Sequence, residues 1–128
     1  MEALDYPRKN YVSKAYNGIG LIKYQLARHD EAKKAFQKAI DIEIKSNDLA
    51  GLARSYSNIN LAYEVDNKVD ESIEFLKKAL EINTQIGRKP MVISNHYNIG
   101  MSYMDSGIPS NYFSAFTHFK QGYEMSVE

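Results

Sequence analysis

The chain has 128 residues, with sixteen basic and sixteen acidic side chains, and its net charge is therefore zero. This balance leaves no basic footprint for nucleic acid or for an anionic membrane. The absence of cysteine excludes disulfides, thiolate catalysis and cysteine-based zinc sites, and it fits a reducing compartment. No apolar run approaches the ~18 residues of a membrane span, and no signal-peptide core opens the chain. We expect a cytoplasmic protein without nucleic-acid or membrane partners.

The first regular pattern begins near residue 13. Residues 1–12, MEALDYPRKNYV, contain Pro7 among charged neighbours and predict a lead-in segment. From there Ile19, Ile22 and Leu26 follow helical spacing, and a polar turn, ARHDEA, comes next. Asp30 stands where the N-cap of a second helix belongs. That helix alternates lysines with the apolar residues Ala35, Phe36, Ala39 and Ile40.

The same pattern returns 40 residues later. The stretch AYNGIGLIKYQLARHDEAKKAFQKAIDI aligns with SYSNINLAYEVDNKVDESIEFLKKALEI, in which Asp70 takes the place of Asp30. A third copy opens with HYNIGMSYMDSG, and Pro90 suits the first turn of its first helix. A fixed period between 20 and 50 residues is typical of a solenoid.

Small residues recur at fixed positions of the repeat. Gly20 and Gly100 on the first helices, with Ala32 and Ala39 on a second helix, allow two helices to approach closely. This spacing of small and large residues resembles the tetratricopeptide repeat family over residues 13–128, in a form with a long period. The resemblance implies an all-α fold, a right-handed superhelix of three helix-turn-helix repeats with six antiparallel helices. We place the repeats at about 13–48, 49–88 and 89–128 of a single domain.

The third copy departs from the strict period. At 40 residues, Tyr112 and Phe119 would occupy the slots of Ala32 and Ala39, where large aromatic residues do not fit. An insertion of three residues instead places Ala115 and Gly122 in these slots and Phe119 over Phe36. We therefore predict a longer turn, about Ser106 to Ser114. We expect Tyr112 and Phe113 to pack locally under this turn, and an exposed apolar patch is the alternative.

No residue pattern predicts chemistry. His29, His96 and His118 lack a second ligand at helical metal-site spacing, so we expect no metal site. The acidic pairs at residues 30–31 and 70–71 are explained by helix capping. Nucleophile elbows, phosphate loops and dinucleotide fingerprints are absent from the sequence. We predict a protein that is not an enzyme and needs no cofactor.

Two asparagines on the first helices are the most informative polar residues. Asn58 and Asn98 share one register, and an amide can pair with a peptide backbone. An inter-repeat hydrogen bond or a solvated face is the alternative, and Asn60 is predicted to be structural because the other copies have glycine there. By the resemblance, the first helices line a concave groove, and its expected peptide-binding residues are Asn17, Leu21, Tyr24, Arg54, Asn58, Leu61, Tyr97, Asn98 and Met101.

The leading hypothesis for function is a non-enzymatic module that binds a protein or peptide segment in this groove. A clamp for the carboxylate of chaperone tails is not expected, because its lysines and arginine are missing from the corresponding positions. Long repeats of this kind look like those of Rap- and PlcR-like bacterial regulators and of adaptor scaffolds. Peptide-pheromone sensing in a larger regulatory or signalling protein is therefore one alternative. Self-association through an uncapped C-terminal end, as in a structural scaffold, is the other.

Overall fold

The protein is a stack of six helices in a computed structural model that describes residues 6–128. The helices are α1 (Tyr6–Gln25), α2 (His29–Ser46), α3 (Leu49–Val65), α4 (Val69–Gln85), α5 (Lys89–Asp105) and α6 (Ser110–Ser126). Residues 1–5 of the predicted lead-in lie outside the described residues. Residues 6–12 belong to α1, so the expected boundary at residue 13 falls inside a helix.

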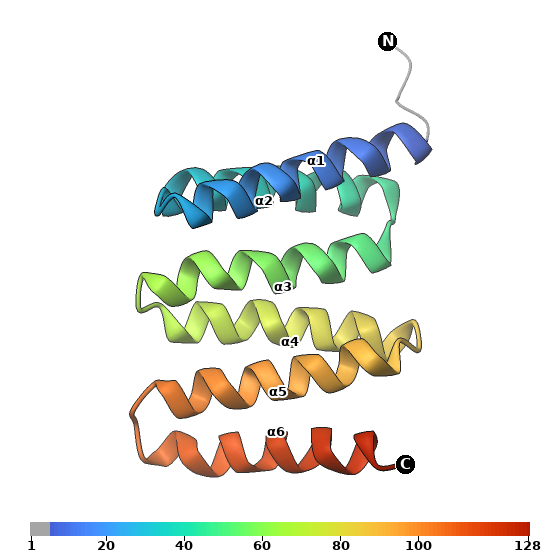
Figure 1. Cartoon of the computed structure of the whole chain (residues 1–128). Coiled ribbons are helices and arrows are strands. Elements are labelled where there is room, and N and C mark those ends of the chain that lie inside the picture. Colours follow the sequence, from blue (N-terminus) through green and yellow to red (C-terminus); the bar gives the residue numbers. More distant parts are fainter. Residues whose placement is uncertain (1–5) are drawn as a thin grey trace.

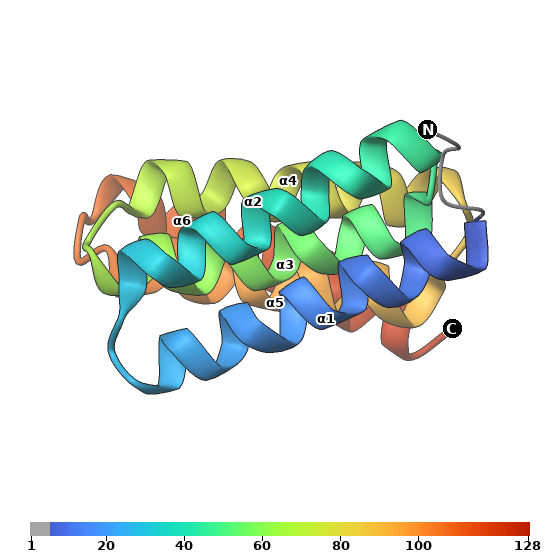
Figure 2. The same ribbon diagram turned by 90° about the horizontal axis from the view of Figure 1, so that it is seen from above.

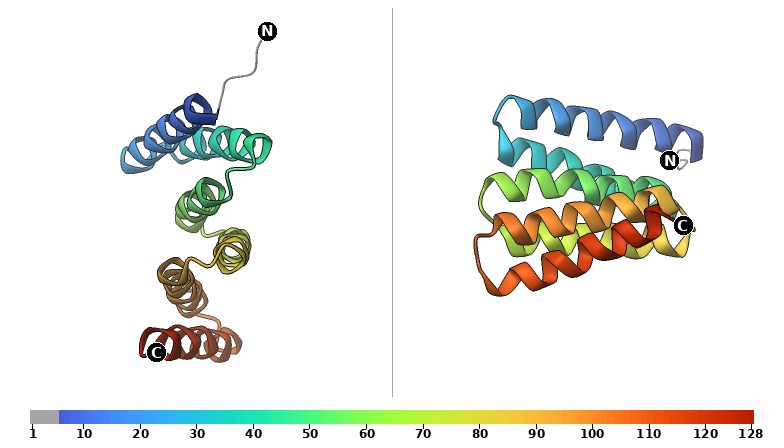
Figure 3. Two further views of the ribbon diagram at one scale, coloured as in Figure 1. Left: turned by 90° about the vertical axis from the view of Figure 1, so that its right-hand side faces the viewer. Right: turned by 60° about the horizontal axis from the view of Figure 1, so that its bottom comes forward.

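Each helix packs antiparallel against its neighbours in the chain, and the two termini lie at opposite ends of the stack (Figure 1). The view from above shows all six helices running nearly along one direction (Figure 2). Seen along the helices, the chain descends in a zigzag, with α3 and α5 on one side and α4 on the other (Figure 3). Apart from these sequential contacts, α1 also packs on α3. The predicted all-α fold of three helix-turn-helix units is thus confirmed.

One residue in each turn takes the left-handed conformation, and these residues keep the period of the repeat. They are Ala27, Asn67 and Gly107 within the repeats and Asn47 and Gly87 between them. Asparagine and glycine adopt this conformation at low cost. After Asn47, the Asp48 side chain accepts a hydrogen bond from the Gly51 amide at 3.1 Å and caps α3.

The predicted caps of α2 and α4 are wrong. These helices begin at His29 and Val69, so Asp30 and Asp70 lie inside the first turn. The residues at the cap positions, Arg28 and Lys68, form no side-chain cap hydrogen bond. Acidic residues in the first turn still stabilise these helices because the helix dipole places positive charge there.

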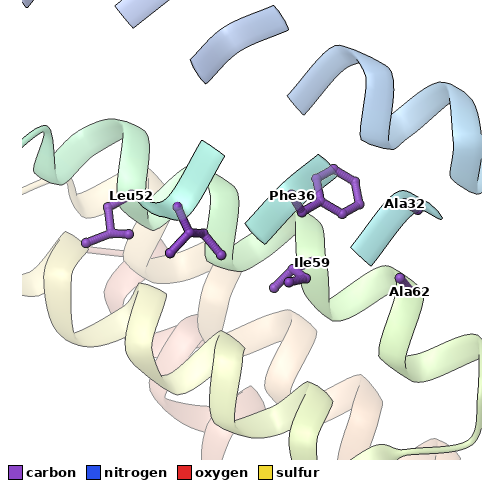
Figure 4. Packing of buried hydrophobic residues seen from close by; sticks show 6 residues of the cluster. Ala32, Phe36, Leu52, Ile59 and Ala62 are labelled. Carbon is purple, nitrogen blue, oxygen red and sulfur yellow. The ribbon is translucent and has the colours of Figure 1, made fainter. Parts of the chain in front are cut away.

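The largest buried cluster joins the first two repeats. Phe36 and Ile40 from α2 meet Leu52 and Ile59 from α3, with the small side chains of Ala32 and Ala62 between them (Figure 4). Phe36 is fully buried. A second cluster links α4 to α5 through Ile73, Leu76 and Ile99. The core is therefore a line of apolar contacts that follows the stack, as expected of a solenoid.

Two glycines mark the closest approach of paired helices, as the sequence predicts. A Cβ atom on Gly20 would lie 2.5 Å from Cε1 of Phe36, and one on Gly100 would lie 2.8 Å from Cε1 of Phe119. In the middle repeat Asn60 takes this position and is buried, with its Oδ1 atom accepting a hydrogen bond from Ser72 Oγ at 3.2 Å. The structural role predicted for Asn60 is confirmed.

The third repeat has the predicted register and a different turn. Ala115 and Gly122 are buried, and Phe119 packs on Gly100 as Phe36 packs on Gly20. The turn spans only residues 106–109, however, and α6 starts at Ser110. One inserted residue lengthens the turn and the other two extend the start of the helix.

The expected local packing of Tyr112 and Phe113 is also wrong. Their side chains are 48% and 77% exposed. The extra residues were absorbed by helix rather than by a loop, so no loop remained for the two rings to pack beneath.

Candidate functional site

A trough runs along α3 and α5 on the side of the first helices. Two hollows, of about 170 and about 270 Å³, share Ser57 and Asn98 and so form one continuous depression. Asn98 is exposed, and Tyr97 beside it is 56% exposed. Six of the nine predicted peptide-binding residues line this trough: Arg54, Asn58, Leu61, Tyr97, Asn98 and Met101.

The three predicted residues on α1 lie elsewhere. Tyr24 packs against the core cluster, and its ring is 5.9 Å from that of His29. Asn17 is buried, with 5% of its surface exposed. Leu21 is exposed but lines neither hollow of the trough. The direct packing of α1 on α3 separates these residues from the space between α3 and α5.

Asn17 belongs to a buried polar chain at the junction of the first two repeats. Its amide nitrogen donates to Ser55 Oγ at 2.8 Å, and Ser55 donates to the Glu43 carboxylate at 2.5 Å. Asn58 joins this chain by donating to Asn17 Oδ1 at 3.3 Å. The prediction that Asn17 presents its amide to a ligand is therefore wrong, and Asn58 makes the inter-repeat hydrogen bond that was the alternative for it.

The next junction repeats this chain with different residues. Asn83 donates to Asn95 at 2.8 Å, and Asn95 donates to Ser57 Oγ at 3.4 Å. Asn83, Asn95 and Ser57 lie 40 residues after Glu43, Ser55 and Asn17, in the same order. Both chains satisfy buried polar groups that would otherwise be costly, and they fix the first helices beside one another.

The two ends of the trough carry opposite charge. Arg54 and Arg88 lie near the amino ends of α3 and α5, whereas Glu64 and Asp105 lie near their carboxyl ends. The helix dipoles add to the same polarity. Burial, and secondly the charge of Asp105, raises the pKa of Glu64. A ligand in the trough thus meets cations at one end and acceptors at the other.

Glu43 is a buried carboxylate whose pKa is raised, chiefly by burial, although the hydrogen bond from Ser55 opposes this effect. A raised folded-state pKa means that stability falls as the pH rises from the unfolded value, 4.5, through the folded one. The Glu43→Gln variant keeps an acceptor for Ser55 and loses the charge, as Asn83 does at the next junction. We expect it to gain about 1 kcal/mol in free energy of unfolding at about pH 7.

Urea denaturation across this pH range measures the effect. The advantage of the variant should shrink towards pH 4.5, where the carboxylate of the unfolded wild type is half protonated. Glu81→Gln, at an exposed position on α4, removes the same charge and should leave the stability nearly unchanged. An advantage of Glu43→Gln that did not vary with pH would contradict this assignment.

Two histidines predicted to be independent form a pair across α5 and α6. The Nδ1 atoms of His96 and His118 lie 3.0 Å apart, so one ring donates and the other accepts. Burial lowers the pKa of both, and the charges of His96 and Lys77 lower that of His118 further. Within residues 6–128 no group of three metal-ligating side chains comes together. The pair is therefore a structural contact between neutral rings.

Some of these residues were missed in the sequence for different reasons. Arg88 lies in a turn, outside the helical faces that the repeat pattern orders. Glu43 follows the apolar stripe of α2 and gives no local sign of burial. The His96–His118 pair had a signal, because 40- and 43-residue shifts place it over Tyr56 and Phe75, whose rings lie 6.0 Å apart.

Comparison with known proteins agrees with this architecture. A family model described as tetratricopeptide repeat matches residues 11–85, which is more than half of the chain. The crystal structure of BtubC (BKLC) from P. vanneervenii is similar in fold, with a TM-score of 0.76 and 15% sequence identity. The match covers 92% of this chain and 47% of that chain, so the chain spans about half of its length. None of the curated proteins matches.

Among the described residues no helix is long and apolar enough to cross a membrane. Members of this family are generally protein-binding modules without catalytic activity. The matched model and the three stacked helix pairs lead to one conclusion: the chain belongs to the tetratricopeptide repeat family.

Proposed function

We propose that the trough between α3 and α5 binds a short, extended peptide segment of a partner protein. The observation that carries this proposal is the composition of its wall. Asn98 and Tyr97 are exposed, with apolar Leu61 and Met101 beside them, and none of these four side chains has a hydrogen-bond partner among the described residues. An amide next to apolar pockets suits an extended backbone with side chains of moderate size.

The charges of the trough give the peptide a preferred direction. From Arg54 to Glu64 the α3 helix rises by about 15 Å, which about five residues of extended peptide cover. An acidic side chain or a terminal carboxylate faces Arg54 and Arg88, and a basic side chain faces Glu64 and Asp105. Charged ends of this kind fix orientation and register more than they raise affinity.

Asn98→Ala tests the site more cleanly than Asn58→Ala, because Asn58 also holds Asn17. Peptides are selected from a random library of short linear sequences on the wild-type chain, and their affinities are then measured by fluorescence polarisation. We expect Asn98→Ala to weaken binding about tenfold, as the loss of one good hydrogen bond would do. Gln37→Ala, at an exposed amide on α2, is the control and should bind as the wild type does.

The selected peptides also test the direction of binding. Sequences with an acidic residue at one end and a basic residue at the other should dominate, and Arg54→Gln should weaken them most at low salt. Selection of peptides that bind Asn98→Ala and the wild type equally would place the binding surface outside the trough.

Peptide-pheromone sensing of the Rap and PlcR kind is the narrower form of this proposal. It draws support from Asn58 and Asn98, which share a register on two first helices and both line the trough. It requires that the bound peptide be a free signal rather than a segment of a protein. Tight binding of free peptides with an unblocked carboxylate, and loss of binding when that terminus is amidated, would favour it.

A further inference from the structure

One face of α6 is apolar and uncovered. Tyr112, Phe116 and Tyr123, which follow helical spacing, are 48%, 62% and 66% exposed. A shift of 43 residues places them over Val69, Ile73 and Leu80 of α4, which belong to or pack against the cluster that α5 covers. The face of α6 therefore has the register of a surface on which another first helix packs.

A hollow of about 380 Å³ marks the place where such a helix would lie. It is lined by Met104 of α5 and by Tyr112, Ala115, Phe116 and Phe119 of α6, and it shares no residue with the trough. In the first repeat the residues at the positions of Ala115 and Phe119 are Ala32 and Phe36, which are buried in one cluster with Ile59 and Ala62 of α3.

The opposite end of the stack carries the matching surface. On α1, Ile19 and Ile22 are 46% and 62% exposed. Forty residues later, Ile59 and Ala62 are 1% and 0% exposed because they pack into the cluster with α2. The side chains of α1 that would contact a preceding second helix are thus apolar and uncovered among the described residues.

We propose that α1 of a second copy docks on α6, so that copies stack head to tail and continue the superhelix. Ile19 and Ile22 of the second copy fill the hollow over Ala115 and Phe119, as Ile59 and Ala62 meet Ala32 and Phe36 within the chain.

An exchange of residue types supports this pairing. Between α2 and α3, Lys33 Nζ lies 4.4 Å from the ring of Tyr63. The corresponding positions of the docked pair are Phe116 on α6 and Lys23 on α1, so the aromatic ring and the lysine change sides. A head-to-tail contact joins two different faces and leaves one of each open, so it generates open chains rather than closed dimers.

Analytical ultracentrifugation of the 128-residue chain tests the proposal. The wild type should shift from a monomer of 14.6 kDa to a series of larger species as its concentration is raised about a hundredfold. Phe116→Glu and Ile22→Glu, each at an exposed position, should both remain monomeric, with far-UV circular dichroism confirming that they fold. Gln121→Glu on α6 and Gln25→Glu on α1 add the same charge at other exposed positions and should associate as the wild type does.

Mixing the two monomeric variants gives the sharpest result. The Phe116→Glu chain keeps its α1 face and the Ile22→Glu chain keeps its α6 face, so an equimolar mixture should form a one-to-one pair and nothing larger. Self-pairing of α6 faces would instead leave Ile22→Glu able to dimerise alone, and this outcome would overturn the proposal. A wild type that stays monomeric throughout would overturn it too and would assign the α6 face to another occupant.

Discussion

Phe36→Ala is expected to lower the free energy of unfolding by about 3–5 kcal/mol. The ring is fully buried, it joins α2 to α3 in the main cluster, and it lies against Gly20 of α1. Its removal opens a cavity where three helices meet, and the glycine on one side has no side chain to fill it. A domain of this size is stabilised by only about 5–15 kcal/mol in total, so the variant should lose a large part of its stability. Urea denaturation followed by far-UV circular dichroism measures the loss.

The matched control is Phe113→Ala on α6. The same atoms are removed from a side chain that is 77% exposed, so the change in the free energy of unfolding should stay within about 0.5 kcal/mol. Equal losses for the two variants would mean that the cluster between the first two repeats is not the main source of stability.

The fold was predictable because its strongest constraints are local and repeated. Steric size alone placed Ala115 and Gly122 in the slots of Ala32 and Ala39, and the structure confirms that register. The same reasoning assigned Asn60 to the contact with α4, because glycine stands there in the other copies. A repeat compares each position with its counterparts, and this comparison gives information that a single helix does not.

The site was less predictable because it depends on distances between helices. Asn17 and Asn58 have equivalent-looking positions on a first helix, yet α1 packs on α3 and buries one of them. Whether an amide faces a neighbouring helix or solvent depends on that spacing, which residue patterns do not contain. The turn before α6 failed for a related reason: an insertion can lengthen a helix as well as a loop, and the sequence of residues 106–114 permits both.

Two glycines in α1 are expected to respond to alanine with opposite signs. Gly18 has nothing within 4 Å of the position that a Cβ atom would take, so Gly18→Ala should gain about 0.5–1 kcal/mol through its higher helix propensity. At Gly20 the added atom would lie 2.5 Å from Cε1 of Phe36, and the buried ring cannot move aside. Overpacking costs about 1–3 kcal/mol, which exceeds the gain in propensity, so Gly20→Ala should be destabilising.

A second substitution separates the close contact from any other effect at Gly20. If the ring of Phe36 causes the loss, Gly20→Ala should cost less in a Phe36→Leu background, because the smaller side chain leaves room for the new methyl group. The two changes would then be non-additive, as expected for residues in direct contact. Thermal and urea unfolding of the four chains in this cycle give the coupling free energy. Additive losses, or a Gly20→Ala variant as stable as Gly18→Ala, would mean that α1 lies farther from α2 than the packing of Phe36 on Gly20 requires.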